Sequence, residues 1–154
     1  MIPNVDDRLA SVIRALTEVI LPHLPPEASL AQEQVQLAVG HLQILRAQID
    51  ALPGYEREEL ADGRALGAAL AGCAGGAQTT AATAALAGAT AAQGEDGRAL
   101  LKSINTAIEA LVRAVAADGE AASQAKLATT ILKHERTRAR KDREWYAPFG
   151  FDTL

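Results

Sequence analysis

The sequence contains few of the residues that mark several common protein classes. It has one cysteine, Cys73, so no internal disulfide can form, and a lone thiol suits a reducing cytoplasm. Aromatic residues make up 3% of its 154 residues, so the core must be aliphatic. With 49% hydrophobic residues and a net charge of −4, the chain is not a disordered acidic protein, a collagen or a disulfide scaffold. The acidic balance also argues against nucleic acid as a partner.

No targeting or membrane-spanning segment is predicted. The N-terminus lacks a basic region followed by an apolar run. The uncharged stretch 65–93 holds few large aliphatic residues, and its Ala, Gly and Thr gain little from lipid. We therefore expect a cytoplasmic protein with no membrane partner.

Motifs that identify an enzyme or a metal site are also missing. Neither a Glu-x-x-His nor a His-Glu-x-x-His pattern surrounds His23, His41 or His134, and one cysteine cannot complete a zinc site. Nucleophile-elbow, P-loop and dinucleotide-binding motifs are absent. We predict no metal and no cofactor, and we favour a non-enzymatic protein. Distant residues of a helical fold can still assemble an active site.

Helical periodicity, in contrast, is abundant. Apolar residues recur at steps of three and four over most of the chain, and no segment alternates as a strand does. A helix that opens at Asp96 is predicted to carry one such row, formed by Leu101, Ile104, Ile108, Leu111 and Val115. We predict an all-α fold, a four-to-five-helix up-down bundle, because several connections are short. Its single domain spans 1–145, ends in a long helix from about 120 to 145, and is followed by a docking tail, 146–154.

Several helix ends have recognisable signals. Asn4 is a predicted N-cap, and Ser29 with Gln32 is typical of a capping box. Asp-Gly-Arg-Ala-Leu occurs at 62–66 and 96–100, and we interpret both copies as helix N-termini capped by Asp. Pro53-Gly54 is expected to end the second helix.

The second helix has two apolar rows with heptad spacing. Val35, Ala38, Leu42, Leu45, Ile49 and Leu52 form the first row, and Leu37, Ile44 and Ala51 form the second. An apolar arc this wide predicts a central helix with two neighbours.

Small residues dominate the middle of the chain. Residues 61–94 include 15 Ala and 7 Gly. The pair Gly63-x-x-x-Gly67 allows two helices to approach closely. The segment 79–93 is either a short helix or a partly ordered loop. It serves either as a connector or as a surface for a flat ligand against glycine backbone.

The C-terminal segment concentrates charge and aromatic residues. Eight of the ten residues from 135 to 144 are charged, and 126–143 carries seven basic and two acidic residues. The pairs Arg138/Asp142 and Arg140/Glu144 have i,i+4 spacing, typical of a solvated helix face, with anion or acidic-surface binding as the alternative. Four of the five aromatic residues lie within the last ten positions, so we expect this tail to dock on its own bundle, on a second copy, or on a partner. The candidate interface residues are Arg136, Arg140, Lys141, Arg143, Trp145, Tyr146, Phe149 and Phe151.

His134 is the leading polar candidate. It continues an inward row of the last helix, and histidine ionises near neutral pH. Together with Glu135 and Arg138 it forms the candidate ligand-binding site; the alternative is a histidine hydrogen-bonded at the end of the core.

The segments 19–24 (Val-Ile-Leu-Pro-His-Leu) and 34–42 (Gln-Val-Gln-Leu-Ala-Val-Gly-His-Leu) resemble those of uncharacterised small all-helical bacterial proteins. The resemblance covers roughly the first 55 residues and implies a role for no individual residue. Such proteins look like companions of acyl-CoA-handling or kinase-like enzymes.

Two functions remain open from the sequence. The first is an accessory or interaction protein that self-associates, with a dimer favoured and a partner enzyme possible. The second is a binding protein or enzyme for an anionic small molecule, such as a CoA- or phosphate-containing one, with a pocket near His134.

Overall fold

The computed structural model describes residues 4–147. This part of the chain contains α1 (Val5–Arg14), α2 (Ser29–Gln48), α3 (Leu52–Leu70), α4 (Ala77–Ala91), α5 (Gly97–Asp118) and α6 (Ala121–Tyr146). A π-helical turn (Ala15–Ile20) and a 3-10 turn (Leu21–His23) follow α1, and extended pairing over these residues is limited to one isolated bridge. The all-α prediction is confirmed. None of the helices within 4–147 combines the length and apolarity of a bilayer span.

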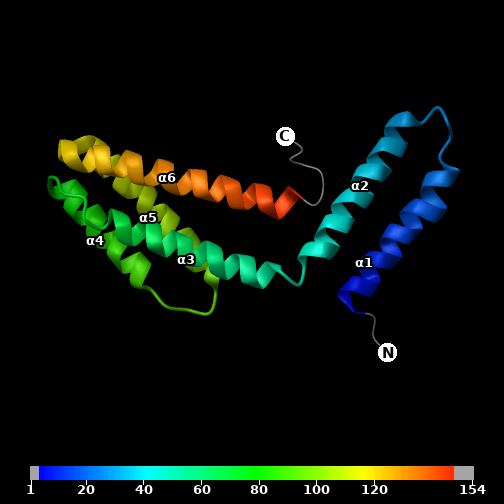
Figure 1. The fold of residues 1–154 in the computed structure, drawn as a ribbon, viewed down its shortest axis with the longest axis horizontal. Helices are drawn as coiled ribbons and strands as arrows, with labels where there is room; N and C mark the ends of the chain where they lie inside the picture. The colour runs from blue at the N-terminus through cyan, green and yellow to red at the C-terminus, as the bar shows by residue number, and fades with distance from the viewer. Residues whose placement is uncertain (1–3, 148–154) are drawn as a thin grey trace. The chain divides into compact units, whose positions relative to one another are not determined.

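The chain divides into two units, 1–53 and 54–154, which we describe one at a time. The first holds α1 and α2, and the second holds α4, α5, α6 and nearly all of α3 (Figure 1). The single domain over 1–145, the tail over 146–154 and the four-to-five-helix bundle arrangement stay predictions.

The first unit is a helical hairpin. Its N-terminal cap is confirmed: the Asn4 side chain accepts a hydrogen bond from the Asp7 N–H at 2.7 Å, and Asp7 accepts one from the Asn4 N–H at 3.3 Å. Arg46 of α2 donates from Nε to Oδ1 of Asp6 at 2.5 Å and so links the two helices. The predicted Ser29/Gln32 capping box is wrong, because Ala28 is the N-cap and Gln32 donates to the Pro25 carbonyl at 2.9 Å instead.

Few side chains of the hairpin are buried. Val35, Leu42 and Ile49 are half-buried at steps of seven, as the first predicted row requires, but Leu45 of that row is 55% exposed. Within this unit α2 packs against α1 and the π-helical turn that follows it, and α1 has no buried residue. The second neighbour predicted for α2 is therefore not supplied by the hairpin.

The second unit contains the hydrophobic core. Successive helices from α3 to α6 alternate in direction (Figure 1). The predicted apolar row of α5 is confirmed, since its members from Ile104 to Val115 are buried. The core cluster consists of Leu66, Leu70, Cys73, Leu86, Ile104, Ile108, Leu111, Val115 and Leu127.

Glycines of α3 allow close packing, as predicted. A Cβ on Gly63 would lie 2.6 Å from the Leu101 side chain of α5, and a Cβ on Gly67 would lie 2.5 Å from Oγ1 of Thr90 on α4. Of the two structures considered for 79–93, a short helix or a partly ordered loop, the helix is found, because 77–91 is α-helical.

Two predicted helix boundaries, at Pro53-Gly54 and at Asp62, are wrong, because both lie inside α3. Pro53-Gly54 lies in its first turn, where proline needs no N–H partner, rather than ending α2. Asp62 lies inside α3 and caps no helix, whereas Asp96 is a true N-cap that accepts from the Ala99 N–H at 2.9 Å.

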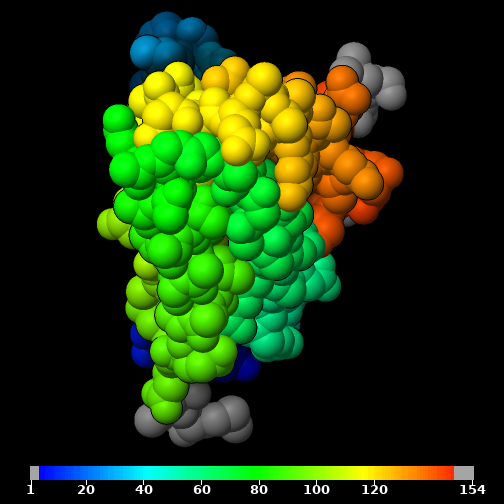
Figure 2. Space-filling model, turned by 90° about the vertical axis from the view of Figure 1, so that its left-hand side faces the viewer, coloured from blue at the N-terminus to red at the C-terminus, as the bar shows by residue number. Residues whose placement is uncertain are grey.

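Two loops meet at one end of the second unit and form what we call the loop clasp, residues 74–76 and 118–120. The Gly76 N–H donates to the Asp118 carbonyl at 2.9 Å, and the Glu120 N–H donates to the Ala74 carbonyl at 3.0 Å. Figure 2 looks onto this end, where green residues of the α3–α4 connection lie directly below yellow residues at the start of α6.

The carboxylate of Asp118 completes the clasp by capping α4. It accepts hydrogen bonds from the backbone N–H groups of Gln78 and Thr79 at 2.8 and 3.0 Å, and from the Thr79 hydroxyl at 2.6 Å. The hydrogen bond from the Thr79 side chain is the main reason why the pKa of Asp118 lies below its ordinary value, with the two backbone donors adding to it and desolvation opposing. One side chain thus ties the C-terminus of α5 to the N-terminus of α4.

We expect Gly75→Ala to lower the free energy of unfolding by about 1–3 kcal/mol, the usual effect of forcing atoms into a packed site. A Cβ there would lie 2.7 Å from the Asp118 carbonyl oxygen and from Cα of Gly119. Gly88→Ala in α4 is the matched control, because a Cβ there meets nothing within 4 Å. Helix propensity predicts a gain of about 0.5–1 kcal/mol at that site. Urea unfolding followed by circular dichroism measures the free energy of unfolding of both variants. Equal changes at the two sites would contradict the close backbone contact at the loop clasp.

We expect Asp118→Asn to destabilise the protein at neutral pH, and the difference from wild type to vanish in acid. A carboxylate with a lowered pKa in the folded state stabilises the protein above the unfolded-state pKa of about 3.9. That contribution is lost as pH falls through the lower folded-state pKa. Urea midpoints should therefore differ by a constant amount from pH 7 to about 5 and converge below about pH 4. A difference in urea midpoint that persists unchanged at pH 3 would show that the charge of Asp118 does not contribute to stability.

Candidate functional site

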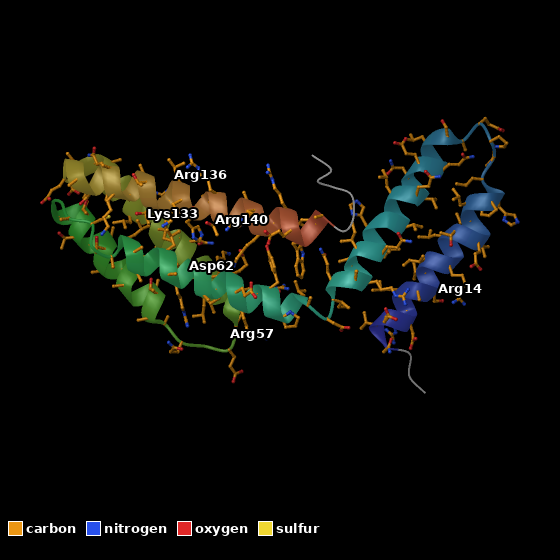
Figure 3. The ribbon with its side chains drawn as sticks, viewed as in Figure 1. Arg14, Arg57, Asp62, Lys133, Arg136 and Arg140 are labelled. Carbon is orange, nitrogen blue, oxygen red and sulfur yellow. The ribbon has the colours of Figure 1, made fainter. Side chains whose placement is uncertain are left out.

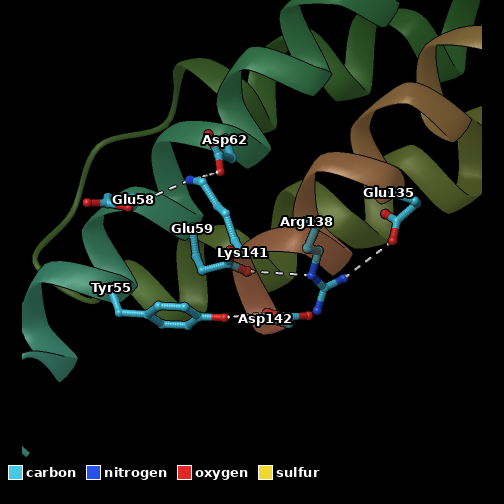
Figure 4. A network of polar contacts seen from close by, with 8 residues as sticks. All are labelled: Tyr55, Glu58, Glu59, Asp62, Glu135, Arg138, Lys141 and Asp142. Atoms are coloured by element: carbon cyan, nitrogen blue, oxygen red, sulfur yellow. Dashed lines mark hydrogen bonds and ion pairs between the residues drawn. The ribbon is translucent and has the colours of Figure 1, made fainter. Parts of the chain in front are cut away.

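An acidic turn of α3 faces the basic run of α6. Tyr55, Glu58, Glu59 and Asp62 recur at steps of three and four, which places them on one side of α3. Arg138, Lys141 and Asp142 lie on the opposing side of α6, and the two sets interlock in Figure 4. We call these residues, with Glu135, the α3–α6 network.

Lys141 and Arg138 of α6 each contact carboxylates of α3. Nζ of Lys141 lies 2.5 Å from Oδ2 of Asp62 and 3.6 Å from Oε2 of Glu58. Nε of Arg138 lies 3.7 Å from Oε2 of Glu59, whose side chain is only 16% exposed. The hydrogen bond to Asp62 is the main reason why the pKa of Lys141 is raised, so its ammonium stays charged throughout the neutral range.

Tyr55 and Trp145 close the outer end of the network. The Tyr55 hydroxyl donates to Oδ1 of Asp142 at 2.7 Å. Burial and then this hydrogen bond raise the pKa of Tyr55 well above its ordinary value. The rings of Tyr55 and Trp145 are tilted by 33° with centroids 4.5 Å apart, an ordinary separation for an aromatic pair. Trp145 therefore docks against its own subunit.

A cavity of about 290 Å³ lies beside this network, between α3, α5 and α6. All three candidate ligand-binding residues, His134, Glu135 and Arg138, line it. The other lining residues are Glu59, Asp62, Gly63, Leu66, Leu101, Asn105, Ile108, Glu109 and Ile131.

The cavity has an apolar floor and a polar mouth. Leu66 and Ile108 of the floor belong to the buried core. At the mouth, His134 is half-buried, Asn105 is exposed, and neither side chain has a hydrogen bond to another residue within 4–147. The predicted alternative for His134, a hydrogen bond at the end of the core, is therefore not formed within the described range.

The basic residues of α6 fall into two groups that the sequence did not separate. Lys141 lies inward in the network. Lys133, Arg136 and Arg140 lie elsewhere along α6 (Figure 3). These three are exposed, and none forms an ion pair with another described residue.

The predicted i,i+4 pairs along α6 are not formed. Arg138 contacts Glu59 and Glu135, and Asp142 accepts from Tyr55, while Arg140 has no ion pair with Glu144. Arg138 and Asp142 have partners on α3, a carboxylate and a hydroxyl, whereas Arg140 and Glu144 are both exposed.

The remaining interface candidates have different settings. Arg143 and Tyr146 are exposed, and Trp145 is half-buried. Phe149 and Phe151 lie outside the described residues.

Sequence reasoning missed the α3 and α5 sides of this site. The signal for α3 was its run of acidic residues between 56 and 62, opposite in charge to 126–143. Asn105 and Glu109 on α5 carried no comparable signal. No group of His, Cys, Asp and Glu within 4–147 is arranged to hold a metal ion.

Comparison with known proteins finds no counterpart: no family model matches the sequence, and no curated protein and no solved structure is significantly similar to it.

The α3–α6 network should contribute modestly to stability, through Lys141 above all. A double-mutant cycle of Asp62→Asn and Lys141→Met should give a coupling of about 0.5–1 kcal/mol at low salt, near the upper end for exposed pairs, and less at 1 M salt. The same cycle on Glu109 and Arg113 of α5, 3.8 Å apart and both largely exposed, should give at most about 0.5 kcal/mol. Urea unfolding measures both cycles. A larger coupling for the α5 pair would show that Lys141 does not hold α6 to α3.

Proposed function

We propose that this chain is a non-enzymatic helical interaction protein that associates with a second copy of itself through the hairpin of α1 and α2. The observation that carries the proposal is the row of exposed aliphatic side chains on each helix of that hairpin. Dimerisation would bury these rows, and the proposed cytoplasmic setting gives them no lipid to enter.

The two rows share one spacing. Val5 and Val12 of α1 and Val19 of the π-helical turn lie seven residues apart and are 55%, 48% and 59% exposed. Leu30 and Leu37 are also seven residues apart and are 69% and 50% exposed. Helices whose apolar rows repeat every seven residues pack side by side with a slight supercoil. Two hairpins can thus complete a four-helix bundle with the same surface used on both copies.

Energetics favours covering these rows. Burying a whole Val or Leu side chain stabilises by about 1.5–3 kcal/mol, so covering one that is half exposed contributes roughly 1 kcal/mol. Ile44 is the only buried residue described in α1, α2 or the turns between them. Two helices with so little of their own core normally depend on further packing.

Charge gives a second copy an advantage over an arbitrary partner. Residues 1–53 carry six acidic and three basic side chains, while Lys133, Arg136 and Arg140 of α6 are exposed and form no ion pair with another residue of 4–147. With a net charge of −3 each, two paired hairpins repel each other, and we expect the basic residues of α6 on each copy to lie beside the hairpin of the other copy and offset this repulsion. Arg143, Tyr146, Phe149 and Phe151 belong to the proposed C-terminal part of this interface. A partner enzyme in place of the second copy is an outcome that the experiment below detects.

We expect the wild-type protein to sediment as a dimer at micromolar concentration, and V12K/L37K to sediment as a monomer with unchanged helicity. Lysine at these positions places charge in the proposed interface but disturbs no buried contact, because both residues are about half exposed. Val112→Lys on α5 is the matched control, since Val112 is 37% exposed but lies outside both the hairpin and α6, and it should leave the dimer intact.

Two results would overturn this proposal. One is a wild-type monomer of 16 kDa at every concentration. The other is a dimer that V12K/L37K and wild type form equally well. If the wild type is monomeric and V12K/L37K alone loses binding to an enzyme co-purified with it, the hairpin serves that enzyme instead.

A further inference from the structure

We propose that the cavity between α3, α5 and α6 binds a small organic cation, an amine with a short apolar body. This site is independent of the proposed self-association, because all its residues lie in the second unit and none belongs to the hairpin. The proposal rests on the cavity's floor, on the polar groups at its mouth, and on the sign of the charge left there.

The floor can take only an apolar group. Leu66 and Ile108 are 7% and 8% exposed, and Leu101 and Ile131 beside them are half-buried. Gly63 adds no side chain at this level, and a Cβ there would meet Leu101. A volume of about 290 Å³ lies at the lower end for small-molecule sites, so the apolar body must be short.

The mouth presents polar groups whose hydrogen-bonding capacity is not used. The imidazole of His134 and the amide of Asn105 approach from α6 and α5 and have no partner within 4–147. A side-chain amide and a neutral imidazole can each accept a hydrogen bond from a ligand N–H. Convergent polar groups over an apolar floor are the usual features of a ligand site.

The charge at the mouth selects a cation. Four carboxylates line the cavity, and the inner two already have partners: Asp62 contacts Lys141, and Glu59 contacts Arg138. The outer two are weakly engaged. Oε2 of Glu109 lies 3.8 Å from Arg113, and Oε2 of Glu135 lies 3.9 Å from Arg138, with both carboxylates more than half exposed.

An ammonium group at this mouth would contact the carboxylates of Glu109 and Glu135 without displacing a strong ion pair. A phosphate or CoA group, which the sequence led us to expect near His134, would instead meet those carboxylates with Arg138 as the only lining cation, and Arg138 is already shared by two of them. The lining therefore favours the opposite charge to the one expected.

Isothermal titration calorimetry with three probes of equal chain length tests this assignment. The probes are hexylammonium chloride, hexan-1-ol and sodium hexanoate, added to the full-length protein at pH 7.5 and 50 mM salt. We expect saturable binding of hexylammonium, at least tenfold weaker binding of hexanol, and none of hexanoate. Propylammonium should bind more weakly than hexylammonium, because it covers less of the floor.

Conservative variants locate the binding. Glu109→Gln and Glu135→Gln should each weaken hexylammonium binding by roughly threefold to tenfold, since each removes one charge and keeps the shape. Glu95→Gln, an exposed carboxylate in the loop before α5, is the matched control and should leave the affinity unchanged. Circular dichroism confirms that each variant is folded. Imidazole NMR signals of His134 should shift on titration while those of His23 stay in place.

Three outcomes would overturn the proposal: no saturable binding of hexylammonium, hexanoate binding as tightly as the amine, or equal affinities for wild type, Glu109→Gln and Glu135→Gln. The V12K/L37K variant separates this site from the hairpin. It should bind hexylammonium like wild type, and loss of binding in it would show that the amine occupies the aliphatic rows of the hairpin instead of the cavity.

Discussion

The close backbone contact at the loop clasp is the constraint on which the second unit depends. A Cβ on Gly75 would lie 2.7 Å from Cα of Gly119 across the clasp, and Asp118 ties the start of α4 to the end of α5. Because the α3–α4 and α5–α6 connections are held together there, all four helices share one fixed end. Their packing then follows in sequence along the bundle: core leucines and isoleucines first, the cavity next, and the Tyr55–Trp145 ring pair last.

Ion pairs between α3 and α6 add to the contacts that the loop clasp makes. Toward the ends that are farthest from the loop clasp, α3 and α6 carry fewer aliphatic residues. The contact between the two helices becomes polar there, through Lys141, Arg138 and the carboxylates of α3. Such pairs are individually weak in water, so they orient α6 more than they stabilise it. The cavity lies where the aliphatic contact gives way to the polar one, which is why its floor and its mouth differ so much in chemistry.

The sequence predicted what depends on local pattern and missed what depends on distant partners. The apolar row of α5, the Asn4 and Asp96 caps and the glycine approach of α3 all follow from short-range spacing, and all are confirmed. Asp62 was misassigned because an Asp-Gly pair has the same local signal inside a helix as before one; its partner, Lys141, lies 79 residues away. His134, Glu135 and Arg138 were found together because they share α6, whereas Asn105 and Glu109 come from another helix and had no signal. The Ser29 cap failed for a local reason, since the Gln32 side chain donates to the Pro25 carbonyl seven residues earlier.

The uneven distribution of buried side chains implies that the two units differ in how readily they open. Backbone amides exchange with solvent deuterium through local or global opening, and the slowest ones belong to the best-packed segments. Five of the buried residues lie on α5, whereas α1 has none. Deuterium should therefore label the hairpin of the isolated chain early and the middle of α5 last. The unit that we propose meets a second copy is thus the one with the least packing of its own, so a bound copy would protect its amides most.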